Sequence, residues 1–89
     1  MKFHAGDVCI VMASGNNGVV VLLRQRSGLA QPAWEIDVVG ASPLYHTIGD
    51  RLHIVRSSCD LRHKGIKIAV READLQLLFR PLSLDALGA

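Results

Sequence analysis

The sequence predicts an all-β domain, a small barrel of five or six antiparallel strands. Short apolar or alternating runs recur along the chain, separated by Gly, Pro and Asn turn signals roughly every eight to twelve residues. No long segment shows the 3.6-residue period of an amphipathic helix. Closing the strands into a barrel removes most of the exposed edges that an open sheet of this size would keep.

Length and composition favour one soluble domain. The chain has 89 residues, of which 49% are hydrophobic and 20% charged. We expect a single domain at residues 1–89, with its core at about residues 5–82 and a C-terminal tail at 83–89. The apolar runs are far shorter than the roughly 20 residues of a membrane helix. The short apolar runs therefore predict no membrane partner. Two cysteines do not make a disulfide framework, so we expect a cytoplasmic protein.

The first half of the chain predicts three strands. Val8 to Met12 is apolar without clean alternation, Val19 to Gln25 is apolar until it ends in Arg24 and Gln25, and the turn signal Asn17-Gly18 lies between them. Trp34 to Val39 alternates, with Trp34, Ile36 and Val38 on one face and Glu35 and Asp37 on the other. The two acids are interpreted as a solvated face or as a site for a basic partner.

The second half predicts further short strands and one tight turn. Gly40 to Asp50 is interpreted as a long connection or an irregular edge, because it contains Gly40, Pro43 and Gly49. The remaining elements are strands at Arg51 to Arg56, Ile66 to Val70 and Gln76 to Arg80, a loop at Ser57 to Gly65, and a 3₁₀ turn within Arg71 to Leu75.

Alternation assigns most of the core to twelve side chains. The predicted core residues are Val8, Ile10, Val20, Leu22, Trp34, Ile36, Val38, Ile54, Ile68, Val70, Leu75 and Leu78. Trp34 is a core residue or an exposed stacking platform, and Cys9 is expected to act as a small buried hydrophobe.

The order of these features resembles the SH3-like barrel superfamily. The residues that carry the resemblance are Gly6-Asp7-Val8-Cys9, Asn17-Gly18, the stretch from Trp34 to Gly40, the 3₁₀ region from Val70 to Leu75, and Leu78-Phe79-Arg80-Pro81-Leu82. More narrowly, the chain resembles small proteins encoded in bacterial phages and prophages. The resemblance implies the fold and that genomic setting, and no activity. The chain lacks the aromatic groove of peptide-binding SH3 domains, so proline-rich recognition is not expected.

Positive charge is concentrated in about one quarter of the chain. Between Arg51 and Arg71 there are six Lys and Arg residues and one acid, Asp60, although the whole chain carries only +2. The predicted partner-binding residues are Arg56, Arg62, His63, Lys64 and Lys67. Such a surface suits an acidic protein, and the alternative is a nucleic-acid-binding barrel that uses the basic 51–71 region.

No residue spacing in the chain indicates catalysis. Cys59 and His63, with His46 or His53, would give only one recognisable pair of zinc ligands, where structural zinc sites use four ligands. Neither cysteine has a spacing to a histidine that predicts a nucleophile and its base. We therefore expect no enzyme, no metal and no cofactor, and interpret the chain as a non-catalytic protein-interaction module, with a phage or prophage accessory or host-interaction protein as the setting.

Overall fold

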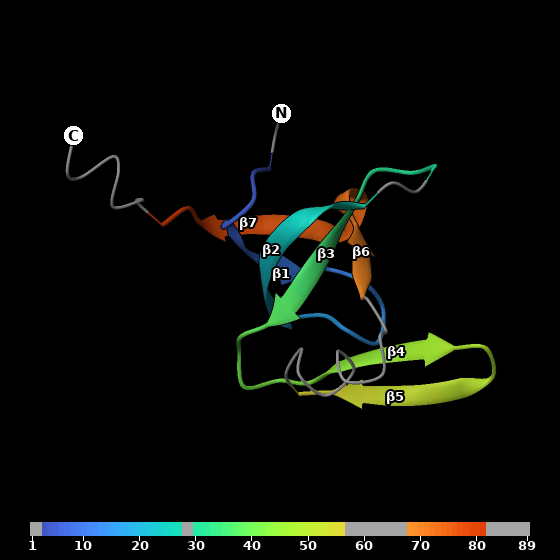
Figure 1. The fold of residues 1–89 in the computed structure, drawn as a ribbon. Helices are drawn as coiled ribbons and strands as arrows, with labels where there is room; N and C mark the ends of the chain where they lie inside the picture. The colour runs from blue at the N-terminus through green and yellow to red at the C-terminus, as the bar shows by residue number, and fades with distance from the viewer. Residues whose placement is uncertain (1–2, 28–29, 57–67, 82–89) are drawn as a thin grey trace, which may run out of the picture.

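The computed structural model describes residues 3–27, 30–56 and 68–81, which form β-strands and one 3₁₀ turn (Figure 1). The elements are β1 (Val8–Val11), β2 (Val20–Ser27), β3 (Ala33–Val38), β4 (Leu44–Ile48), β5 (Arg51–Val55), β6 (Ala69–Arg71), η1 (Glu72–Asp74) and β7 (Leu75–Phe79). The all-β prediction is confirmed, and so is the 3₁₀ turn before the last strand. None of the described residues belongs to a helix long and apolar enough to span a membrane.

Five strands form one curled antiparallel sheet, in the order β6-β3-β2-β1-β7. Its two edge strands, β6 and β7, are joined by the three residues of η1. Three residues span at most about 10 Å, so the two edges approach each other at that end of the sheet. The strands nevertheless do not close into a barrel within the described residues, and the predicted closed barrel is not shown.

The region from Gly40 to Asp50 is not the long connection that the sequence predicts. It contains β4, which pairs with β5 as a separate two-stranded sheet, visible as the hairpin beside the main sheet in Figure 1. Gly49 and Asp50 form the turn, with Gly49 at φ +64°. Gly in a positive-φ conformation at the first central position is what a type II′ hairpin turn requires.

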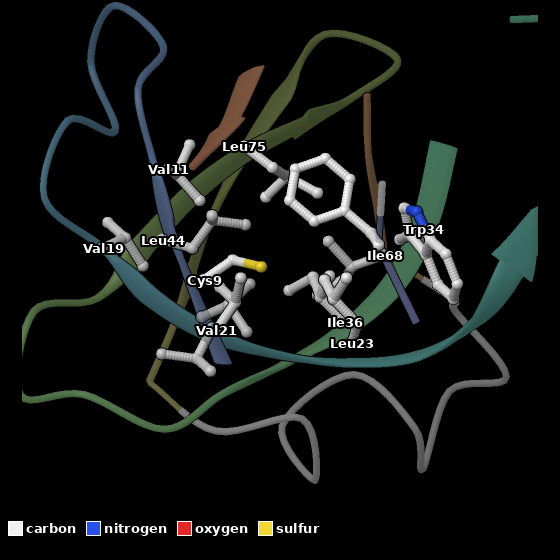
Figure 2. Packing of buried hydrophobic residues seen from close by; sticks show 13 residues of the cluster. Cys9, Val11, Val19, Val21, Leu23, Trp34, Ile36, Leu44, Ile68 and Leu75 are labelled. Atoms are coloured by element: carbon white, nitrogen blue, oxygen red, sulfur yellow. The ribbon is translucent and has the colours of Figure 1, made fainter. Parts of the chain in front are cut away.

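The core lies inside the curled sheet, and Figure 2 shows its close packing. The buried cluster comprises Phe3, Cys9, Val11, Val19, Val21, Leu23, Trp34, Ile36, Val38, Leu44, Val55, Ile68 and Leu75. Trp34 is 3% exposed, which identifies it as a core residue and excludes the stacking platform.

The predicted core was partly wrong, because β2 and the part of β1 after Val8 present the opposite faces, whereas Val8 itself is buried as predicted. Cys9 and Val11 on β1, with Val21 and Leu23 on β2, are buried. The predicted core residues Ile10, Val20 and Leu22 are half-buried instead. Both strands are apolar on both faces, so alternation alone left their orientation open, and an error of one residue exchanges the two faces.

Three further predicted core residues are also not in the core. Ile54 and Leu78 are 51% and 48% exposed, and Val70 is half-buried against the cluster. Val55 is buried in place of Ile54, because β5 turns its other face to the core.

A β-bulge at Arg24 turns the end of β2. Leu23 is opposite Ile36, but Gln25 is already opposite Glu35, so one residue of β2 has no partner in β3. Beyond the bulge Arg26 lies opposite Trp34, on the face that Leu23 occupies before it. The Arg26 guanidinium therefore lies over the Trp34 ring, 5.4 Å from its centroid, at the end of the sheet.

Candidate functional site

The structure describes only one of the five predicted partner-binding residues. Arg56 directly follows β5 and is exposed. The other four, Arg62, His63, Lys64 and Lys67, lie outside the described residues, as do Cys59 and the predicted loop from Ser57 to Gly65.

The β4–β5 hairpin presents an apolar face to solvent, which we call the hairpin outer face. It consists of the cross-strand pairs Tyr45–Ile54 and Thr47–Leu52, which lie on one side because directly opposed residues point the same way. Tyr45 is 44%, Leu52 62% and Ile54 51% exposed. Alternation along the sequence predicts Ile54 in the core, so this face was missed.

The opposite face of the hairpin attaches it to the rest of the molecule. Leu44 and Val55, which are partners across the strands, are 2% and 0% exposed and belong to the core cluster. Among the described side chains of the hairpin, these two belong to the core cluster. An isolated two-stranded hairpin is marginally stable, so its position depends on these contacts.

Asn16 makes a second attachment of the hairpin, through the backbone of Tyr45 on β4. Its side-chain amide donates from Nδ2 to the Tyr45 carbonyl at 2.9 Å, and its Oδ1 accepts from the Tyr45 amide at 2.7 Å. Asn16 thus binds β4 as a neighbouring strand would. Asn16 directly precedes the turn signal Asn17-Gly18, so the structure adds that this turn also helps to orient the hairpin outer face.

A pocket of about 520 Å³ lies at the far end of the main sheet, next to η1. Its lining residues are Phe3, Arg26, Gln31, Pro32, Arg71, Glu72 and Ala73. Both lining arginines already lie beside carboxylates. Arg26 lies 3.6 Å from the Glu72 carboxylate, which also lines the pocket, and Arg71 lies 3.1 Å from that of Asp74, outside the lining. Each guanidinium is therefore partly neutralised by a neighbouring acid.

The polar face of β3 is paired within the sheet. Arg24 contacts the Asp37 carboxylate at 2.7 Å, and Gln25 donates to Glu35. Both acids are half-buried beside these partners on β2. The arrangement is that of a solvated sheet face stabilised by cross-strand pairs.

The one thiol within the described residues is chemically inert. Cys9 is completely buried and free, and burial, with a smaller contribution from the Asp7 charge, raises its pKa to about 11. Since the thiolate is the nucleophile, a thiol held neutral in the core does not react readily. Among residues 3–27, 30–56 and 68–81, no group of three His, Cys, Asp or Glu side chains is arranged to hold a metal ion.

Comparison with known proteins gives no relative that would assign a function. No protein-family model, curated protein or solved structure matches this chain.

Proposed function

We propose that this protein is a non-catalytic protein-interaction module that binds a protein with an acidic surface. The observation that carries the proposal is the hairpin outer face, where Tyr45, Leu52 and Ile54 are each between 44% and 62% exposed. Exposed apolar side chains that gather on one face mark interaction surfaces, whereas single ones are ordinary. A partner that covered this face would also stabilise a hairpin whose described attachments are Leu44, Val55 and the Asn16–Tyr45 hydrogen bonds.

The charge around the hairpin supports an acidic partner. Arg51 begins β5 and Arg56 follows its end, both exposed. They open the basic stretch that continues to Arg71, in which Asp60 is the one acid. We propose that Arg56, Arg62, His63, Lys64 and Lys67 contact carboxylates of the partner around an apolar centre.

We further propose that the fold is an SH3-like barrel with the β4–β5 hairpin inserted between β3 and β6. Three features support this: Gly6-Asp7 opens β1, Trp34 lies in β3, and η1 connects the last two strands of the main sheet. The resemblance to small phage and prophage proteins supports a role as a phage accessory or host-interaction protein in the bacterial cytoplasm.

The proposal excludes catalysis and places nucleic-acid binding second. Cys9, the described thiol, is buried and neutral, which supports a non-catalytic role. Leu52 and Ile54 are aliphatic and offer no stacking to bases, which single-strand binding uses heavily. Tyr45 is the one aromatic side chain on the hairpin outer face.

A displayed library of random peptides, selected on the immobilised protein, tests the proposal. We expect enrichment of peptides that combine Asp or Glu with apolar residues. The selected peptides are then synthesised, and their affinity is measured by fluorescence anisotropy. The double variant Leu52→Ser/Ile54→Ser should bind them at least about tenfold more weakly, or ~1.4 kcal/mol. Substituting Arg62, Lys64 and Lys67 together by Ser should also weaken binding, with the melting temperature nearly unchanged.

Leu78→Ser is the matched control, because Leu78 is a similarly exposed leucine on β7 of the main sheet. It should leave peptide affinity unchanged. The proposal is wrong if no acidic peptide is enriched, or if the double variant binds as tightly as the wild type. A DNA duplex that binds tightly at low salt, with affinity falling steeply as salt rises, would favour the nucleic-acid alternative.

A further inference from the structure

Two histidines lie directly opposite each other in the β4–β5 hairpin. His46 on β4 is the cross-strand partner of His53 on β5. Directly opposed residues in an antiparallel pair have Cβ atoms about 4.5–5.5 Å apart and point to the same side. Their side is the one that carries Leu44 and Val55, opposite to the hairpin outer face, and both histidines are half-buried.

Neither imidazole is engaged within the described part of the chain. Each makes no hydrogen bond or ion pair there, although both rings are partly withdrawn from water. Two neighbouring pairs share this face: Leu44–Val55 is aliphatic, and Ile48–Arg51 carries a guanidinium, whose residue is exposed and makes no described hydrogen bond to either ring. Two adjacent imidazoles therefore keep their nitrogens available for a ligand.

We propose that His46 and His53 bind one divalent transition-metal ion, of which Zn²⁺ is the best-suited probe. Imidazole nitrogens bind zinc at about 2.0–2.1 Å, so two of them in tetrahedral coordination lie roughly 3.3 Å apart. Side chains that start about 5 Å apart on one face can converge to that separation. Water fills the remaining coordination positions, so the site has two protein ligands, unlike a four-ligand structural zinc site, and it departs from the sequence-based expectation of no metal. Hard cations such as Mg²⁺ and Ca²⁺ prefer oxygen ligands and are excluded by this donor set.

The site has a structural consequence for the hairpin. A metal ion bridging β4 and β5 fixes their register part-way along the strands, beyond the anchored pair Leu44–Val55. It would therefore stabilise the hairpin beyond Leu44 and Val55, its two described members of the core cluster. This inference rests on the register of the two strands and is independent of the proposed partner.

Zinc titration of the untagged protein, followed by the imidazole resonances in NMR and by thermal unfolding, tests the proposal. We expect saturation at one equivalent, with shifts confined to His46 and His53 and a rise in melting temperature. His46→Gln and His53→Gln should each abolish both effects. The matched control His4→Gln, at an exposed histidine outside the hairpin, should retain them. Dichroism without metal establishes that the variants fold.

Cys59→Ser separates this site from one that uses the second cysteine. The shifts of His46 and His53 should persist in that variant. The inference is overturned if binding disappears with Cys59 while the hairpin variants retain it, if all histidines shift without saturation, or if Mg²⁺ produces the same changes. If a glutamine variant failed to fold, the resonances of the wild-type protein would still decide between these outcomes.

Discussion

Arg80 holds the buried carboxylate of Asp7 through two hydrogen bonds, from Nε to Oδ1 at 2.7 Å and from Nη2 to Oδ2 at 2.9 Å. The two residues are 73 positions apart, and they join the start of β1 to the end of β7, which are paired strands. The His4 amide also donates to Oδ2, at 2.8 Å. Asp7 is completely buried, whereas the Arg80 side chain is 45% exposed.

The Asp7 contacts predict acid sensitivity. The Arg80 guanidinium and the His4 amide lower the pKa of Asp7 below its usual value of 3.8, despite the opposing effect of burial. The stability that this carboxylate provides is therefore complete above pH 3.8 and is lost as the pH falls toward the lowered pKa. Asp7→Asn should cost about 1–3 kcal/mol at neutral pH, because it disrupts a buried, satisfied network.

Urea unfolding from about pH 7 to about pH 2 measures this effect. The difference in unfolding free energy between the wild type and Asp7→Asn should shrink as the pH falls. Asp50→Asn, at the exposed hairpin turn, removes the same charge and should leave the wild-type profile unchanged. A constant difference at every pH would show that the Asp7 charge contributes nothing.

Trp34→Ala should destabilise the fold by about 3–5 kcal/mol, since it empties a large core site. That is a large share of the roughly 5–15 kcal/mol typical of whole domains. Trp34→Phe should cost much less, because it keeps an aromatic ring under Arg26 and removes Nε1, a buried donor with no acceptor in the described structure. Chemical denaturation compares the two variants, and equal losses would contradict the packing role of the ring.

The Cys9 thiol should resist alkylation in the folded protein. Burial raises its pKa to about 11, so almost no thiolate exists at pH 8. Iodoacetamide labelling at about pH 8, followed by peptide mass mapping, should modify Cys9 quickly only after unfolding in urea. The stability linked to the neutral thiol is present below its ordinary pKa of 9.0 and is lost as the pH rises through 11. Equal labelling rates in folded and unfolded protein would contradict the burial of this thiol.

Gly40 should not tolerate a methyl group. A Cβ at this position would lie 2.9 Å from Val20 Cβ and 3.3 Å from its Cγ2. The close approach is fixed by two hydrogen bonds, from the Val39 and Gly40 amides to the Val20 carbonyl. Gly40→Ala should therefore cost about 1–3 kcal/mol through overpacking.

A double-mutant cycle with Val20→Gly checks the cause of that loss. Gly40→Ala should be less destabilising when Val20 is replaced by Gly, because both the Cβ at 2.9 Å and the Cγ2 at 3.3 Å are then absent. Ser42→Ala, at an exposed position two residues further along, is the control and should have little effect. Strict additivity of the two substitutions would exclude the steric explanation.

The sequence predicted the features that depend on local pattern. The faces of β3 were assigned correctly, because Glu35 and Asp37 alternate with apolar residues and mark the solvent side. The faces of β1 and β2 were not, since both strands are apolar on both sides. One signal was present: Arg24 directly follows Leu23, and placing its charge in solvent would have assigned Val21 and Leu23 to the core.

The candidate site was harder to predict from the sequence than the faces of the strands, because it depends on tertiary structure. Because Pro43 and Gly49 are typical of loops, the sequence did not predict β4. Without β4, neither the hairpin outer face nor the pairing of His46 with His53 could be predicted. The sequence by itself determined the strands other than β4, the 3₁₀ turn and the concentration of basic residues. Only the tertiary structure decided that Ile54 faces solvent and Val55 the core. The physical reason is that alternation fixes the period of a strand, whereas the side that becomes buried depends on which other elements cover it.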